Sequence, residues 1–142
     1  MNKFKIFTSG AMNGLSFEKQ MKWRTLLEYT VKGNTDKPVE FVHPPMYFDY
    51  EYPDQNFVKE WEISQLLSSD IVVINLENIK DSIGTHMEIG AVIGANKVSG
   101  KNIHIIGIGA PDTEHPWIKS TPLIIVPDVQ SASDYIVKYF LV

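Results

Sequence analysis

Ile71-Val72-Val73-Ile74 is an unbroken run of β-branched residues, and it decides the fold. Such a run is typical of a central parallel strand that is buried on both faces, because a half-solvated strand would alternate polar and apolar residues. Further β-rich segments occur at residues 4–8, 39–42, 103–108 and 123–126, and helical patterns separate them. The alternation predicts a doubly wound α/β fold of the flavodoxin or Rossmann-like kind. Its five parallel strands would be joined by right-handed crossovers, with helices on both faces of the sheet.

Helices are expected from Ser16 to a stop signal at Gly33-Asn34, and over residues 57–69, 85–97 and 133–141. In the first of these, apolar residues recur at a spacing of three to four and predict the face that packs on the sheet. They are Phe17, Met21, Trp23, Leu26, Leu27 and Val31.

Length and composition limit the classes of protein to which this chain can belong. The 142 residues predict a single domain, 1–142, with 44% apolar and 21% charged residues, which is ordinary globular usage. A net charge of −4 without a basic run argues against binding of a nucleic acid polymer. The absence of cysteine excludes disulfides, thiol nucleophiles and iron–sulfur clusters. The chain has no run of about 18 apolar residues and enters a strand pattern almost at once, so no membrane contact and a cytoplasmic location are expected.

The loop after the first strand, Ser9-Gly10-Ala11-Met12-Asn13-Gly14, lies where open α/β sheets bind ligands, at the carboxyl ends of the strands. Its glycines would let backbone N–H groups approach a ligand, and the following helix N-terminus favours an anion. A plain connecting turn explains the same residues. The loop lacks both the dinucleotide fingerprint and the P-loop pattern, so no cofactor is expected.

Glu88 has two interpretations. Thr85 and Glu88 have the spacing of a capping box, in which each side chain satisfies a free backbone donor of the first helical turn. Alternatively, Glu88 lies in the first turn of a helix that points at the ligand cleft. The macrodipole would there favour the ionised carboxylate that a nucleophile requires. Local sequence alone favours the capping role.

Residues 46–54 form an aromatic and acidic segment that includes Tyr47 and Tyr50. Their rings would stack on a nucleobase, since aromatic faces bind bases without demanding a sequence, or they would cover the edge of the sheet. The four histidines lack the spacing of metal ligands, so no metal site is expected.

Residues 5–14, 62–70 and 82–91 together resemble the nucleoside 2-deoxyribosyltransferase superfamily, and the similarity extends from Lys5 to Gly109. Its most specific part is the group Gly84, Glu88, Gly90 and Ala91 after an apolar strand and an acidic loop. The resemblance implies cleavage of the N-glycosidic bond between a 2-deoxyribose or ribose and a nucleobase. It also favours Glu88 as the ionised nucleophile that forms a covalent sugar ester.

The resemblance implies further roles around that glutamate. Glu62 matches a family aspartate that orients the sugar or protonates the departing base, and it is one methylene longer. The substrate, a nucleoside or nucleoside monophosphate, would be bound by residues at the sugar, phosphate and base ends of the site. They are Ser9, Gly10, Met12, Tyr47, Tyr50, Asp81, Ser82 and Gly84. Members of such families are commonly homodimers or larger homo-oligomers, and the same is expected here.

Two alternatives to deoxyribosyl transfer remain. Ser82 stands where transferases typically carry an aspartate and where the similar 2'-deoxynucleoside 5'-monophosphate N-hydrolases carry a phosphate-binding serine. Met12, however, stands where that hydrolase branch tends to place an arginine. The second alternative is a non-catalytic module that binds a nucleotide or flavin on the same flavodoxin-like sheet.

Overall fold

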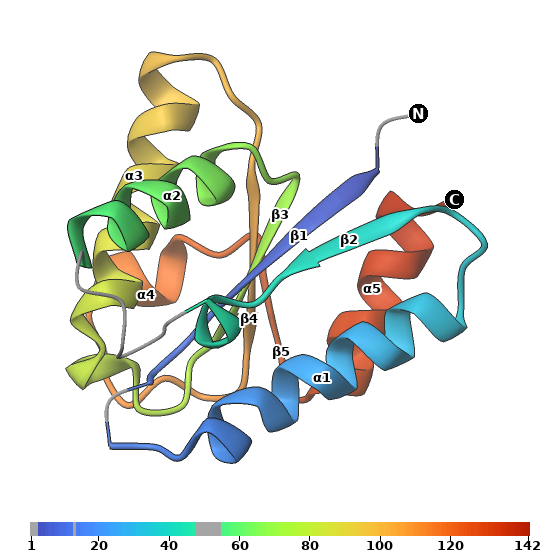
Figure 1. Ribbon diagram of the computed structural model, residues 1–142, viewed down its shortest axis with the longest axis horizontal. Coiled ribbons are helices and arrows are strands. Elements are labelled where there is room, and N and C mark those ends of the chain that lie inside the picture. Colours follow the sequence, from blue (N-terminus) through green and yellow to red (C-terminus); the bar gives the residue numbers. More distant parts are fainter. Residues whose placement is uncertain (1–2, 13, 48–54) are drawn as a thin grey trace.

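The computed structural model describes residues 3–12, 14–47 and 55–142. Its centre is a five-stranded, all-parallel sheet in the order β2-β1-β3-β4-β5 (Figure 1). The strands are β1 (Phe4–Ser9), β2 (Val39–Val42), β3 (Ile71–Asn75), β4 (His104–Ile108) and β5 (Ile124–Val126). The prediction of a doubly wound α/β fold is confirmed.

Helices cover both faces of the sheet (Figure 1). The α-helices are α1 (Phe17–Gly33), α2 (Gln55–Leu67), α3 (Ile83–Val98), α4 (Pro116–Ser120) and α5 (Val129–Phe140). Two short 3-10 helices are η1 (Pro44–Met46) and η2 (Ile79–Asp81). Helices α1 and α5 pack against each other on one face, and α2 and α3 do so on the other.

Strand β3 connects the two halves of the core. Its residues Ile71 and Val73 belong to the cluster under α1 and α5, whereas Val72 and Ile74 belong to the cluster under α2 and α3. All four side chains are at most 1% exposed. Because successive side chains of a strand point to opposite faces, both faces of β3 require apolar residues. This requirement explains the unbroken run in the sequence.

The strand order creates a crevice between β1 and β3. The chain leaves β1 toward α1 on one face and leaves β3 toward α3 on the other, so the two connections diverge at the carboxyl ends (Figure 1). Ser9 and Ile74 are paired in register near these ends. Such a switch point is where open α/β sheets bind ligands.

The predicted packing face of α1 is partly wrong. Phe17 and Leu26 are 59% and 53% exposed. The buried stripe consists instead of Gln20, Arg24, Leu27 and Val31. Its spacing is helical, but its first half is polar, so a search for apolar periodicity misplaces the face.

Helix boundaries also differ from expectation. Helix α3 begins at Ile83, two residues before the predicted start, and α5 begins at Val129 after the N-cap Asp128, four residues before it. Helix α4 was not anticipated in the loop after β4, and its Ile118 joins the same core cluster as α3.

Gly107→Ala should destabilise the fold. An added Cβ at Gly107 would lie 2.8 Å from Cδ1 of Leu76, a side chain that is only 1% exposed and has little room to move. Overpacking of this kind costs about 1–3 kcal/mol. Urea unfolding would measure the loss of free energy.

Gly94→Ala is the matched control, because nothing lies within 4 Å of a Cβ added at that exposed position of α3. Alanine in a helix interior should leave stability unchanged or raise it by up to about 1 kcal/mol. Equal losses in the two variants would contradict the packing argument.

Candidate active site

Ser9 and Glu88 form the centre of the candidate site. Ser9 ends β1, Glu88 lies on α3, and the Ser9 hydroxyl donates a hydrogen bond of 3.2 Å to Oε1 of Glu88. The other carboxyl oxygen, Oε2, is buried and has no hydrogen-bond partner among the described residues. Buried polar atoms are normally paired, so an unpartnered carboxyl oxygen in a crevice points to a functional role.

The structure contradicts the capping role of Glu88. The N-cap of α3 is Ser82, so Glu88 lies six residues further on, beyond the first turn. The hydroxyl of Thr85 pairs with that of Ser82 at 2.7 Å instead of forming a capping box with Glu88. The expectation that the helix macrodipole ionises Glu88 is wrong for the same reason, since the effect falls off within the first turn.

A cavity of about 790 Å³ opens in front of Glu88. This volume is within the range of small-molecule sites. The loop after β1, helix α2, the segment before α3 and the start of α3 line it. Seven of the predicted site residues are among its lining: Gly10, Met12, Glu62, Asp81, Ser82, Gly84 and Glu88. Ser9 lies behind this lining and reaches it through Glu88.

The predicted base-stacking tyrosines are not brought to the cavity in the described part of the chain. Tyr47 packs against Trp61 with ring centroids 4.4 Å apart, and it is not among the described lining residues. Tyr50 lies outside the described residues.

Gly10 allows the elements around the site to approach one another. A Cβ at this position would lie 3.2 Å from Cζ2 of Trp23 and 3.3 Å from Cβ of Asn75. The glycine therefore serves close packing of α1 and β3 beside the site, rather than an unusual backbone conformation.

Arg24 is a buried residue beside the candidate site that the sequence reasoning missed. Its side chain is fully buried. The guanidinium donates to the Gln20 carbonyl at 2.6 Å, to the Thr8 hydroxyl at 3.2 Å and to the Gly10 carbonyl at 3.5 Å. Its position in the buried stripe of α1 is the signal that could have revealed it, because a charged residue at a core position needs partners.

The charges of Glu62, Glu88 and Arg24 affect one another's pKa. Burial, and after it the proximity of Glu62, raises the pKa of Glu88 to about 8, although Ser9 and Arg24 oppose this. Burial also raises the pKa of Glu62, against the attraction of Arg24. Burial lowers the pKa of Arg24 to about 10, so the guanidinium stays charged at neutral pH. The raised pKa of Glu88 favours a protonated carboxyl in the free site near neutral pH, and the ionised nucleophile stays a prediction.

A hydrogen-bonded chain holds Arg24 from behind. The Thr8 hydroxyl lies 2.8 Å from Nδ1 of His43, whose Nε2 lies 2.7 Å from Oε1 of Glu28. Burial lowers the pKa of His43 despite this carboxylate, which favours the neutral imidazole. With the proton on Nε2, His43 donates to Glu28 and accepts from Thr8. The Thr8 oxygen is then free to accept from Arg24.

The raised pKa of Glu88 predicts a pH-dependent stability difference between Glu88→Gln and the wild type. A carboxyl with a pKa of about 8 when folded and an ordinary pKa near 4.5 when unfolded stabilises the protein most below the lower value. That contribution is lost as pH rises through 8. The variant should therefore gain stability relative to the wild type from pH 5 to 8 and level off above, measured by urea unfolding at each pH.

Glu60→Gln is the control, because Glu60 is exposed on α2 and outside the cavity lining. Its stability difference from wild type should stay flat over the same range. A flat profile for Glu88→Gln as well would refute the raised pKa.

Comparisons with known proteins rest on structure. No protein-family model and no curated protein matches the sequence. A conserved protein from Enterococcus faecalis V583 superposes with a TM-score of 0.68 at 16% identity, over 96% of this chain and 99% of that one. The CMP N-glycosidase BcmB of Clostridium botulinum superposes with a TM-score of 0.58 at 15% identity, over the same shares of each chain. This chain shares their fold.

Two further features are absent from residues 3–12, 14–47 and 55–142. No helix there has the length and apolar character to cross a membrane. Nor does that part of the chain bring three or more histidine, cysteine, aspartate or glutamate side chains together as metal ligands.

Proposed function

We propose that this chain cleaves the N-glycosidic bond of a nucleoside, with Glu88 as the nucleophile. The observation that carries the proposal is the Glu88 carboxyl, which is held by Ser9, has a free buried oxygen and lines a substrate-sized cavity. Glu62 supplies a second carboxyl on the same cavity. The shared fold with a CMP N-glycosidase supports this class of reaction.

The reaction would proceed in two displacements, as in retaining glycosidases. In the first, a Glu88 oxygen bonds to the anomeric carbon while the bond from that carbon to the base nitrogen breaks. The electron pair leaves with the base, to which Glu62 gives a proton. In the second, a nitrogen of an acceptor base attacks the anomeric carbon, the ester bond breaks, and the electron pair returns to Glu88. Glu62 recovers the proton that the acceptor loses.

The raised pKa of Glu88 bears on this division of roles, because the free site favours a proton on the carboxyl that must act as the nucleophile. A carboxyl pair that shares one proton near neutral pH provides both an acid and a nucleophile. Arg24 lowers the pKa of both carboxyls and Ser9 lowers that of Glu88, so the proposed reaction requires the shared proton to move from Glu88 to Glu62 when the substrate binds. An oxocarbenium-like sugar, which is positively charged, would further favour ionised Glu88.

The charge of the cavity favours an uncharged nucleoside over a nucleotide. Glu62, Asp81 and Glu88 line it, and Lys59 is the cation among its described lining residues. The loop after β1 contributes the apolar side chains of Met12 and Leu15. A phosphate dianion would meet net repulsion there. Transfer of 2-deoxyribose between bases is therefore the leading assignment.

Hydrolysis of a 2'-deoxynucleoside 5'-monophosphate is the second candidate. Ser82 lines the cavity, with its hydroxyl 2.7 Å from that of Thr85, and is available to bind phosphate. The substrate named for the C. botulinum neighbour is also a nucleoside monophosphate. Water would then replace the acceptor base in the second displacement.

Glu88→Ala should abolish turnover. Removal of a covalent nucleophile lowers kcat by at least about 1,000-fold, so the variant should be inactive while its circular dichroism is unchanged. The measurement is chromatography of mixtures of protein and deoxynucleosides or deoxynucleoside monophosphates, each with and without an acceptor base. A new nucleoside that forms only with acceptor shows transfer, and free base plus sugar phosphate shows hydrolysis.

Glu60→Gln is the matched control and should retain wild-type turnover. Full activity of a folded Glu88→Ala protein would refute the role of Glu88. No turnover of any substrate by the wild type would refute the proposal and favour a nucleotide-binding module.

Asp81→Asn should shift substrate preference toward nucleotides. The wild type should turn over a deoxynucleoside with higher kcat/KM than the corresponding 5'-monophosphate. Removing one carboxylate near the phosphate should raise kcat/KM for the monophosphate about three- to tenfold, the size of one unit-charge interaction in water. The deoxynucleoside should be little affected. A monophosphate preference in the wild type that Asp81→Asn leaves unchanged would favour the hydrolase instead.

A further inference from the structure

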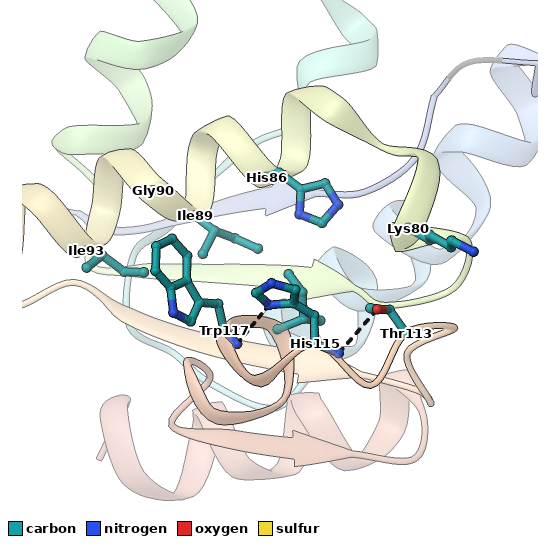
Figure 2. Close-up of a pocket in the computed structure, with 9 residues that line it drawn as sticks. Lys80, His86, Ile89, Gly90, Ile93, Thr113, His115 and Trp117 are labelled. Carbon is teal, nitrogen blue, oxygen red and sulfur yellow. Dashed lines mark hydrogen bonds between the residues drawn. The ribbon is translucent and has the colours of Figure 1, made fainter.

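A second cavity, of about 420 Å³, lies on the other side of α3 (Figure 2). It shares no lining residue with the cavity at Glu88. Helix α3 forms a wall between the two: Thr85 and Glu88 line the first, whereas His86 and Ile89 line the second. The function proposed above makes no use of this second cavity.

One end of the second cavity is apolar and flat. The ring of Trp117 stands beside Ile89 and Ile93 of α3 (Figure 2). It is 72% exposed, which is unusual for so large an apolar side chain. Gly90 adds no side chain to the wall, and nothing lies within 4 Å of a Cβ built there. A planar ring therefore has both a face to stack on and room to enter.

The other end carries hydrogen-bond donors and positive charge. His86 lies at this end, and His115 lies between it and Trp117; the exposed Lys80 lies at the rim, where its side chain extends away from the two histidines (Figure 2). Nδ1 of His115 accepts the Trp117 backbone N–H at 3.3 Å, so a neutral His115 carries its proton on Nε2 as a free donor. The Lys80 ammonium forms no ion pair within the described residues.

The neighbouring acids are already engaged or face elsewhere. Asp112 accepts the backbone N–H of Lys80 at 2.8 Å, and Glu114 pairs with Lys119 at 2.6 Å. Asp81 lines the other cavity. The charge of Glu114 is offset by Lys119, whereas Asp112 stays negative, so an anion would bind through the exposed Lys80 ammonium against the repulsion of Asp112.

We propose that this second cavity binds a small aromatic anion, with its ring on Trp117 and its anionic group near Lys80, His86 and His115. Both ends of the cavity are needed to specify the ligand. The apolar end would bind an aromatic ring, and the polar end would bind an anionic group. The ligand would contact α3 on the side opposite Glu88.

Phenyl phosphate tests this proposal, since it joins a planar ring to a phosphate. Spectra of the ¹⁵N-labelled full chain should show saturable shifts at the Trp117 indole N–H and the amides of Ile89 and Gly90. Binding should be at least tenfold tighter than that of inorganic phosphate or phenol, which carry one half of the probe each. The amides of Ser9 and Gly10 report separately on the cavity at Glu88, so a failure of the proposed enzymatic function would not affect this result.

Substitutions at each end of the second cavity test which part of phenyl phosphate that end binds. Trp117→Ala and Lys80→Gln should each weaken phenyl phosphate binding at least fivefold. Tyr139→Ala and Lys97→Gln remove an exposed aromatic ring and an exposed lysine outside both cavities, and should bind as the wild type does. The same spectra show whether each variant is folded.

Three results would overturn the proposal. They are binding of phenyl phosphate no tighter than that of its halves, shifts confined to Ser9 and Gly10, and Trp117 signals that change with protein concentration alone. The last result would show that a second copy of the chain occupies this surface.

Discussion

The burial of one positive charge, that of Arg24, organises this end of the molecule. A guanidinium without solvent exposure is costly unless its donors and its charge are both satisfied. Its donors are satisfied by Gln20, Thr8 and Gly10, which ties the first two turns of α1 to the end of β1. Its charge is balanced by Glu88 and Glu62, which approach from the two other elements around the crevice. The charge state of each catalytic candidate is therefore influenced by the same buried cation.

This arrangement explains why the buried residues of α1 are polar in its first half and apolar in its second half. Leu27 and Val31, in its second half, belong to the apolar core, whereas Gln20 and Arg24 lie under the site. Gln20 donates to the carbonyls of Met12 and Leu15 at 3.0 and 2.8 Å, and so holds the loop that lines the cavity. One helix thus stabilises the fold at one end and orders the ligand-binding loop at the other.

The change from polar to apolar residues along the buried stripe of α1 also limits what could be predicted from the sequence. The run from Ile71 to Ile74 predicts a central parallel strand, because a strand buried on both faces tolerates no polar position. The alternation of elements predicts that the segment with Ser82 and Glu88 follows the carboxyl end of a strand, whereas the strand order and the position of Glu62 on α2 come from the structure. Arg24 could not be found by apolar periodicity, since its burial depends on partners from β1, α2 and α3 that are distant in the chain.

The capping hypothesis for Glu88 failed for a related reason. A pattern of four residues cannot locate the helix start here, because α3 begins three positions earlier, at an N-cap Ser82 whose side chain makes no capping hydrogen bond. Once α3 begins after Ser82, Glu88 is released from the helix terminus and its environment is set by Ser9, Glu62 and Arg24 instead. Because adjacent residues of a helix differ by about 100° in direction, His86 and Ile89 must then face away from Glu88. The helical geometry of α3 therefore directs the carboxyl of Glu88 into one cavity and the side chains of His86 and Ile89 toward the other.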